Sequence, residues 1–290
     1  MKYYSPLRYP GGKNKATSLF HDIIDSNGLR NCVYVEPFAG GASVALDLLF
    51  EGYASRIVIN DADPSIYAFW HSCLFHIDEF CHMMNTTDIS TAQWQIQKDI
   101  YRELRKRALD GEDFDLMQLG FATFFLNRTN RSGILKGGVI GGYTQTGKYG
   151  IDARFNRKDL ELRLRRVANF SNRIELHSED AKQFLMVHSP EWPDNTLIYC
   201  DPPYVIRGKD LYMNYFKHQD HRDLADVIMH IMDKIWVTTY DVNDLISEIY
   251  QSKRIRKLIL SYSAGKHTSN SEEYIIFSDN LIIPENEKIK

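Results

Sequence analysis

The sequence predicts an α/β fold, in which a mostly parallel sheet is interrupted by an inserted, mainly helical region. Two stretches of the chain alternate apolar, strand-like runs with helix-like segments, which is the pattern of β-α-β units. The stretch between them has sequence patterns of helices and loops, without the apolar runs that are typical of buried strands. We therefore expect a first sheet segment over residues 1–74, an insertion over 75–174 and a second sheet segment over 175–290.

The first sheet segment begins with the strand-like run 33–38, which ends in a glycine turn and is followed by a helix-like stretch. Gly40 and Gly41 allow the backbone to approach a ligand closely. Asp61 lies 21 residues after Gly40, at the end of the next strand, where a carboxylate can accept hydrogen bonds from ribose hydroxyls. The full GxGxxG pattern is missing, which favours an adenosine ligand without phosphates over a dinucleotide. A tight structural turn with a capping acid is the alternative.

A second glycine turn, RYPGGK, spans residues 8–13. Lys13 could pair with the carboxylate of an amino acid, and Tyr9 could cover an aromatic ring. A loop with a solvated lysine is the alternative.

The second sheet segment contains the strand TLIYC, which runs directly into Asp201-Pro202-Pro203-Tyr204. After it come a helix over 221–235, a strand over 235–241, and two runs, 256–264 and 272–280, that predict an antiparallel hairpin at the edge of the sheet. Ligands of parallel sheets bind beyond the carboxyl ends of the strands, so the tetrapeptide is expected at the mouth of a site.

The tetrapeptide has the parts needed to methylate an aromatic amine. The lone pair of such an amine is delocalised into its ring, so the amine is a poor nucleophile. Asp201 and the carbonyl of Pro202 can grip its two N–H groups and favour the tetrahedral geometry that frees the lone pair, while Pro203 stiffens the turn. Tyr204 can stack on a base that has left the duplex. A sulfonium methyl donor is already activated, so the protein needs mainly to position it.

The insertion is locally basic although the chain has a net charge of −3: from Lys98 to Arg173 there are 16 Lys and Arg against 9 Asp and Glu. Such a patch can hold nucleic acid on a nearly neutral chain, although a solvated basic surface is the alternative. Asn and Arg suit base edges in the major groove, and Lys and Arg suit phosphates. The expected DNA contacts are Asn127, Arg128, Asn130, Arg131, Lys136, Lys148, Arg154 and Asn156.

Taken in order, RYPGGK, EPFAGG, IND and YCDPPY resemble the Dam-like adenine-N6 DNA methyltransferases of the alpha group, a family of restriction-modification systems and phages. The resemblance implies a Rossmann-like S-adenosylmethionine-dependent methyltransferase sheet with an inserted, mainly helical target-recognition domain. It also implies that the target adenine is flipped out of the duplex. The cofactor S-adenosyl-L-methionine would be bound by Tyr9, Lys13, Glu36, Phe38, Gly40, Gly41, Asp61, Asp180 and Asp201.

The sequence departs from this family at two places. Tyr9 stands where Trp is common, and TYD (239–241) replaces a serine-asparagine pair that some relatives carry. A cytosine-N4, RNA or protein-glutamine methyltransferase and a catalytically silent DNA-binding relative are the alternatives. Protein-modifying relatives usually carry Asn at the position of Asp201 and lack a long basic insertion.

Composition and terminus add expectations on location and partners. The first residues lack the apolar core of a signal peptide, no run is long enough to span a membrane, and the four cysteines form no CxxC pair. We therefore expect a cytoplasmic monomer that acts on double-stranded DNA, needs no metal and does not contact a membrane. A cognate restriction endonuclease is the further partner that the resemblance suggests.

Overall fold

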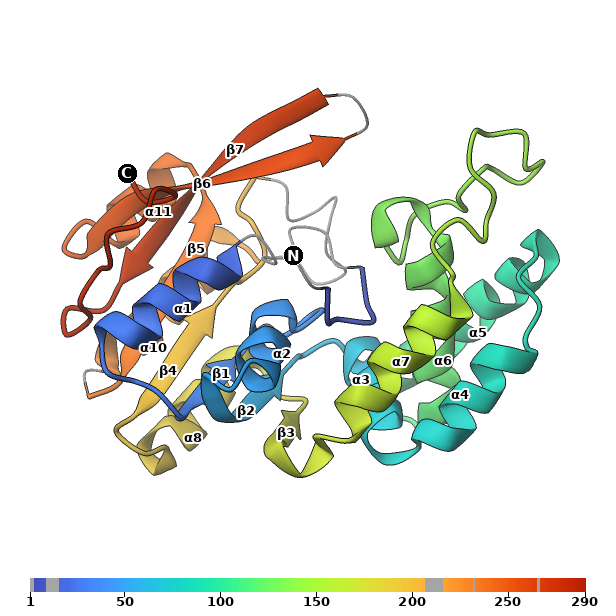
Figure 1. Cartoon of the computed structure of the whole chain (residues 1–290), viewed down its shortest axis with the longest axis horizontal. Helices are drawn as coiled ribbons and strands as arrows, with labels where there is room; N and C mark the ends of the chain where they lie inside the picture. Colours follow the sequence, from blue (N-terminus) through green and yellow to red (C-terminus); the bar gives the residue numbers. More distant parts are fainter. Residues whose placement is uncertain (1–2, 9–15, 207–215, 232, 265–266) are drawn as a thin grey trace. The chain divides into compact units, whose positions relative to one another are not determined.

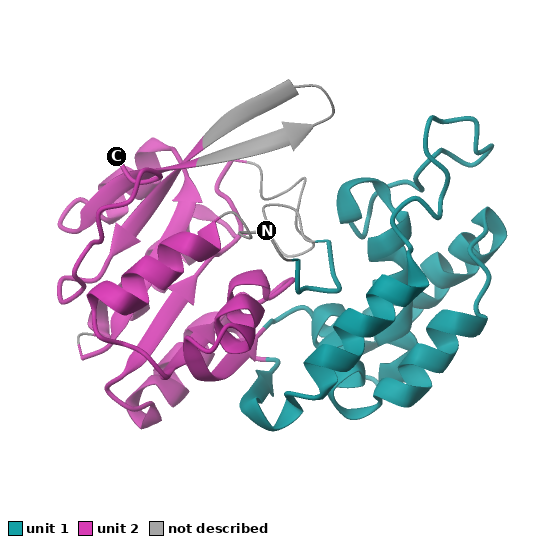
Figure 2. Cartoon of the chain, in the orientation of Figure 1, with its two compact units in different colours: residues 1–12, 61–178 teal, residues 13–60, 179–290 magenta. Residues whose placement is uncertain are grey.

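The structure is a computed structural model that describes residues 3–8, 16–206, 216–231, 233–264 and 267–290, with only the backbone for 260–264 and 267–271. The chain forms two compact units, coloured separately in Figure 2. We call residues 13–60 with 179–290 the sheet unit, and residues 1–12 with 61–178 the helical unit.

The strands form a seven-stranded sheet in the order β3-β2-β1-β4-β5-β7-β6 (Figure 1). Their bounds are β1 Cys32–Glu36, β2 Ala54–Asn60, β3 Ile174–His177, β4 Thr196–Cys200, β5 Ile235–Asp241, β6 Arg254–Ala264 and β7 His267–Phe277. β1 pairs in parallel with β2 and β4, and β4 pairs in parallel with β5. β7 is antiparallel to both β5 and β6. The predicted α/β, Rossmann-like class and the predicted hairpin are both confirmed.

Successive residues of a strand point to opposite faces of the sheet, so a strand that is buried throughout has side chains to cover on both faces. Helices cover both faces of the sheet unit. On one face Val33 and Val35 of β1 join a core with side chains of three helices: α8 (Ala181–His188), α10 (His218–His230) and α11 (Asp244–Ile249). On the other face Phe20 of α1 (Thr17–Ser26) meets the rings of Tyr34 and Tyr199 edge-on, with centroids 6.2 and 4.6 Å away. α2 (Ser43–Phe50) packs beside α1.

The helical unit is built around one central helix. It contains α3 (Pro64–Phe75), α4 (Ile77–Thr86), α5 (Thr91–Leu109), α6 (Leu116–Thr129), the short turn η2 (Arg131–Gly133) and α7 (Arg157–Ala168). Every residue of α6 from Leu119 to Thr129 is buried, and α3 and α5 pack against it. Gly120 permits the close approach of α3, because a Cβ there would lie 2.5 Å from the carbonyl oxygen of Ala68.

Polar side chains fix the starts of several helices by accepting the N–H groups that the first turn leaves unpaired. The capping residues are Asp63 for α3, Ser90 for α5, Asp115 for α6, Asn156 for α7, Asp180 for α8 and Asn243 for α11. Two of the residues expected in the site, Asn156 and Asp180, therefore have a local structural role as well.

The helical unit begins earlier than the insertion expected from the sequence, at Asp61 rather than at residue 75, and it also includes residues 1–12. The reason is that α3 packs on α6, so it follows the inserted helices instead of the sheet. The unit ends at Ser178, close to the expected boundary at residue 174.

Two further findings concern cysteines and membranes. Cys32, Cys73, Cys81 and Cys200 are all free and buried, so they pack as small apolar side chains. Among the described residues no helix combines the length and the apolar character needed to cross a bilayer.

Candidate functional site

The carboxyl ends of β1, β4 and β5 meet at one edge of the sheet unit, because these strands are parallel neighbours. β1 ends at Glu36 and leads into the glycine turn, β4 ends at Cys200 and leads into Asp201, and β5 ends at Asp241. Sequence segments that are far apart in the chain therefore bring acidic and aromatic side chains to a single edge.

A residue of β5 holds the carboxylate of Asp201 by a hydrogen bond. Its Oδ1 accepts a hydrogen bond from the hydroxyl of Thr239 at 2.7 Å, and that hydroxyl lies 2.8 Å from the hydroxyl of Tyr199. A hydroxyl has one hydrogen to donate, so Tyr199 must donate to Thr239 while Thr239 donates to Asp201. The side chain of Asp201 is partly exposed, and Pro202 and Pro203 behind it are buried. A relay of two hydroxyls thus orients a carboxylate that solvent and ligands can reach.

Tyr204 and the two residues after it are tied to the neighbouring strands. The hydroxyl of Tyr204, whose residue is 8% exposed, donates to Glu273 of β7 at 2.8 Å. The backbone N–H groups of Val205 and Ile206 each donate to one oxygen of Asp241, both at 2.9 Å. Sequence reasoning did not identify Thr239, Asp241 or Glu273 as supports of this turn, because they come from neighbouring strands.

Glu36 is buried beside this turn, with 4% of the residue exposed. Its Oε1 accepts hydrogen bonds from the hydroxyl of Tyr34 at 3.0 Å and from the backbone N–H of Ala45 at 3.1 Å, so it caps the start of α2. Burial raises the pKa of Glu36 to about 8, and the negative charge of Asp201 raises it as well. At neutral pH most of the protein molecules therefore carry a proton on Glu36. Through its hydrogen bond to Ala45, Glu36 supports the glycine turn.

The titration of Glu36 predicts a pH-dependent stability. The folded protein binds a proton at Glu36 more tightly than the unfolded chain does, so stability falls as pH rises from about 4.5, the ordinary pKa, to about 8. We expect the free energy of unfolding of the wild type to fall by about 2 kcal/mol more than that of Glu36→Gln between pH 6.5 and pH 8.5. Gln keeps an oxygen for both hydrogen bonds. Urea unfolding at the two pH values measures the difference, and parallel pH curves would contradict the prediction.

Asn60, the last residue of β2, ties the glycine turn to the start of α8. It is fully buried. Its Nδ2 donates to the carbonyls of Pro37 and Glu179, both at 3.0 Å, and its Oδ1 accepts the N–H of Glu179 at 2.8 Å. The carbonyl of Asn60 also accepts the N–H of Ala39 at 2.9 Å. Sequence reasoning missed this residue, although an Asn at the end of an apolar strand is a recognisable signal.

The remaining expected cofactor residues of the sheet unit lie around these supports. Gly40 is in the left-handed region with a φ of 45°, which glycine adopts without strain, and Gly41 after it is buried. Phe38 is partly buried and meets the ring of Phe216 edge-on, with centroids 5.8 Å apart. The exposed Asp180 accepts the N–H groups of Lys182 and Gln183 at the start of α8.

Three expected cofactor residues cannot be placed beside these. Asp61 follows Asn60 in the chain but belongs to the helical unit, where it accepts the N–H of Asp63 at 2.9 Å. Tyr9 and Lys13 lie outside the described residues.

The structure corrects the roles expected for Asn127 and Asn130, which the sequence suggested as DNA contacts. Both side chains are buried, with 2% and 0% of the residue exposed. Asn127 accepts the N–H of Arg8 at 2.7 Å and donates to its carbonyl at 2.8 Å and to that of Gly133 at 3.0 Å. Asn130 accepts from the indole of Trp94 at 2.6 Å and donates to two carbonyls of the loop after η2. Their amides are used within the helical unit, so they cannot also read bases.

Arg128 is corrected in the same way. It is 9% exposed, and its guanidinium donates to the carbonyls of Arg154 and Pro6. These buried bonds hold the N-terminal residues and the loop between α6 and α7 in place. The apolar sequence around residues 119–129 indicates a buried helix. The sequence alone did not show that the polar residues at the C-terminal end of this helix are buried as well.

The other expected DNA contacts are exposed side chains of the same unit. They are Arg131, Lys136, Lys148, Arg154 and Asn156. All five lie between the end of α6 and the start of α7. This segment keeps the local basic character that the sequence predicts.

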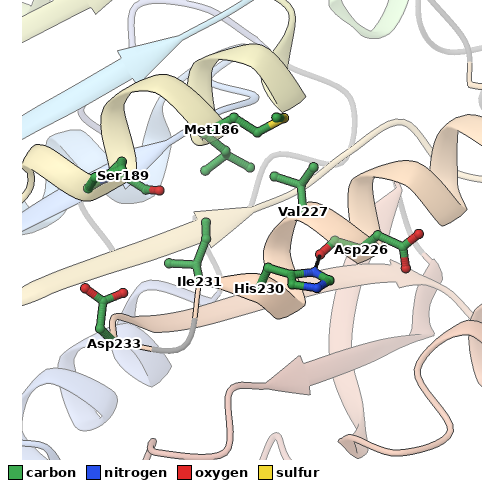
Figure 3. A pocket seen from close by; sticks show the side chains of 9 residues that line it. Met186, Ser189, Asp226, Val227, His230, Ile231 and Asp233 are labelled. Carbon is green, nitrogen blue, oxygen red and sulfur yellow. Dashed lines mark hydrogen bonds between the residues drawn. The ribbon is translucent and has the colours of Figure 1, made fainter.

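A surface pocket of about 480 Å³ lies elsewhere on the sheet unit, between α8 and α10 (Figure 3). It is lined by residues near the ends of these helices, including Met186 and Val227, with Asp226 and Asp233 at its border. These helix ends lead into the starts of β4 and β5. The pocket is therefore at the opposite edge of the sheet from Asp201.

The model of the D12 class N6 adenine-specific DNA methyltransferase family matches residues 9–264. No curated protein matches the chain significantly. Among solved structures, the rRNA methyltransferase aviRa from Streptomyces viridochromogenes is 12% identical, with 93% of this chain and 86% of that chain covered and a TM-score of 0.37. The precorrin-6y C5,15-methyltransferase from Geobacter metallireducens is 10% identical, with 91% and 86% covered and a TM-score of 0.37.

Proposed function

Because the chain belongs to the D12 class N6 adenine-specific DNA methyltransferase family, we propose that its turn from Asp201 to Tyr204 holds the target adenine and that S-adenosyl-L-methionine is its methyl donor. The family match extends over residues 9–264, most of the chain. The protein is an enzyme that methylates the N6 amino group of adenine in DNA with a donor of the S-adenosylmethionine type. The assignment of individual residues is the proposal.

One observation carries the assignment of the catalytic turn: the carboxylate of Asp201 stands at the end of β4, held by Thr239, directly before Pro202 and Tyr204. In the proposed step the carboxylate of Asp201 and the carbonyl of Pro202 accept hydrogen bonds from the two N–H groups of the adenine. The N6 lone pair then forms a bond to the methyl carbon, and the bond from carbon to sulfur breaks to leave a neutral thioether. The proton that N6 must lose departs through the bond to Asp201, with solvent as the final acceptor.

The extruded base would stack on Tyr204. Aromatic stacking compensates for the contacts that the base loses when it leaves the duplex. The buried Pro202 and Pro203 restrict the backbone of this turn, so the acceptors and the ring keep a fixed spacing. Fixed spacing is what an in-line transfer between two bound molecules requires.

The proposed cofactor site is the turn after β1 with its neighbours. Phe38, Gly40 and Gly41 would line it, and Asp180 would accept from the adenine amine of the cofactor. Asn60 supports this grouping, because it ties Pro37 and Glu179 together. For Tyr9, Lys13 and Asp61 the proposal rests on the family motifs alone. Glu36 would act from behind the turn, through its bond to Ala45.

The proposed DNA surface is the exposed basic segment between α6 and α7. Beneath it, burial lowers the pKa of Arg128, and the positive charges of Arg8 and Arg163 lower it further. Arginines gathered in this way repel one another, and backbone phosphates placed near them would relieve that repulsion. We therefore propose phosphate contacts for Lys136, Lys148 and Arg154, and contacts to bases or phosphates for Arg131 and Asn156.

The setting of the reaction is also proposed. We expect the enzyme to act in the cytoplasm as a monomer on double-stranded DNA, without a metal. A restriction endonuclease that cuts the same unmethylated sequence would be its partner in a restriction-modification pair.

A transfer assay with methyl-labelled S-adenosyl-L-methionine tests the function. We expect label on duplex DNA of mixed sequence, recovered after digestion as N6-methyladenine, and much less label on RNA or on protein. Label recovered as N4-methylcytosine, or found only on RNA or protein, would contradict the proposal. Sequencing of the methylated DNA then identifies the target site.

A further inference from the structure

Two carboxylates lie directly opposite each other where β5 and β7 pair. Asp241, the last residue of β5, is the antiparallel partner of Glu273 in β7. Glu273 is 3% exposed. Like charges at directly opposed positions of a sheet destabilise the pairing of the strands. The stability of the sheet alone therefore does not explain why two acids are paired at this position.

Both acids bind the segment that follows Pro203. Glu273 accepts the hydroxyl of Tyr204 at 2.8 Å, while the two oxygens of Asp241 accept the N–H groups of Val205 and Ile206. Three consecutive residues are thus held by one pair of opposed carboxylates, one through its ring and two through the backbone. Hydrogen bonds to a carboxylate are stronger than neutral ones, which offsets the cost of placing the acids together.

The bond to Glu273 acts at the far end of the Tyr204 side chain. A tyrosine ring has two rotatable bonds before it, so packing near the backbone leaves the orientation of the ring adjustable. A second point of attachment at the hydroxyl fixes where the far end of the ring lies. Because a phenolic O–H prefers to lie in the plane of its ring, an acceptor in a fixed place also favours one orientation of that plane. A stacked base needs that plane to be fixed, because a base meets an aromatic side chain face to face.

We propose that Glu273 is a positioning residue that orients the Tyr204 ring as the stacking surface for the extruded adenine, with Asp241 fixing the backbone beside it. The inference rests on the proposed role of Tyr204. Glu273 touches neither donor nor base in this role and acts only through the tyrosine. Its neighbour Glu272, which is exposed and pairs with Lys257 at 2.8 Å, is a matched control on the same strand.

The test uses two duplexes. Turnover is measured on DNA with adenine at the target, and the state of the base is measured on the same DNA with 2-aminopurine there, a base that lacks the amino group to be methylated and whose fluorescence reports both its release from the duplex and its stacking on a ring. We expect Tyr204→Phe and Glu273→Ala each to lower kcat about tenfold, the effect of losing one hydrogen bond, with the KM for S-adenosyl-L-methionine unchanged. Both should alter the 2-aminopurine signal of the complex in the same way. Glu273→Gln, which keeps an acceptor, and Glu272→Ala should stay within about twofold of the wild type. The double variant Tyr204→Phe with Glu273→Ala should be no worse than either single change.

The outcomes separate this inference from the proposed function. Normal kcat and fluorescence in Glu273→Ala, with a strong loss in Tyr204→Ala, would overturn the role of Glu273 and leave that of Tyr204 in place. Normal activity in Tyr204→Ala would instead contradict the proposed function itself. Tyr204→Phe decides the matter if Glu273→Ala does not fold, because it removes a single oxygen atom, and full activity in it would overturn the inference.

Discussion

Asp201→Ala should lower kcat by about 10³-fold, because it removes a charged acceptor that acts on the reacting amine, an effect comparable to removing a donor from an oxyanion hole. The side chain is partly exposed and follows the strand rather than forming its core. Its loss leaves the hydroxyl of Thr239 without this acceptor, but solvent can replace it. The free energy of unfolding should therefore change by only about 1 kcal/mol. Steady-state transfer to DNA and urea unfolding measure the two effects.

Two variants make this prediction selective. Asp201→Asn keeps one acceptor oxygen but loses the charge, so its kcat should lie between those of the wild type and Asp201→Ala. Asp226→Ala removes an exposed acid of the same unit at the α8–α10 pocket and should leave kcat within about twofold of normal (Figure 3). A kcat of Asp201→Ala close to that of Asp226→Ala would exclude Asp201 from the chemistry.

The parts of the fold that could be predicted from the sequence are those that depend on local pattern. The strand that precedes Asp201 and the hairpin of β6 and β7 are apolar runs bounded by turn residues, and both were expected from the text alone. The clustering of Glu36 and Asp201 at one edge also follows from a general rule, because parallel strands end on the same side of a sheet.

The supports of the site could not be predicted because they depend on strand order and register. Glu273 reaches Tyr204 only because β7 inserts beside β5, and nothing in the text between residues 254 and 277 fixes that order. Thr239 reaches Asp201 for the same reason, as a neighbour in the sheet and not in the sequence.

In the helical unit the prediction from sequence was wrong for a different reason: polar residues suggested an exposed surface. Asn127 and Asn130 resemble DNA contacts because they stand beside arginines in a basic region. Both are buried. Asn127 belongs to α6, which α3 and α5 cover along its length, and Asn130 directly after α6 accepts a hydrogen bond from Trp94 of α5. Whether a polar residue faces solvent depends on the helices packed around it, and the sequence of its own helix does not reveal them.

The second large effect is expected at Asn60. Its replacement by Ala removes one buried side chain that satisfies three backbone groups, on Pro37 and Glu179, and leaves them without this partner inside the sheet unit. Each buried group left unsatisfied costs about 1–3 kcal/mol, so the free energy of unfolding should fall by about 3 kcal/mol after partial relaxation. Asn195→Ala is the matched control, because Asn195 is exposed and donates a single bond to Asn31 at 3.3 Å. It should cost less than about 1 kcal/mol.

The same substitution should separate binding from chemistry. Asn60 holds the turn before Gly40 and the residue before Asp180, whereas Asp201 is held by Thr239. At saturating donor the kcat of Asn60→Ala should therefore stay within a few-fold of normal, while the KM for S-adenosyl-L-methionine rises by about tenfold or more, the equivalent of 1.4 kcal/mol. Transfer kinetics at a temperature where the variant is folded measure both constants. A lowered kcat with an unchanged KM would mean that the turn after β1 acts on the chemical step, and that the donor is held elsewhere.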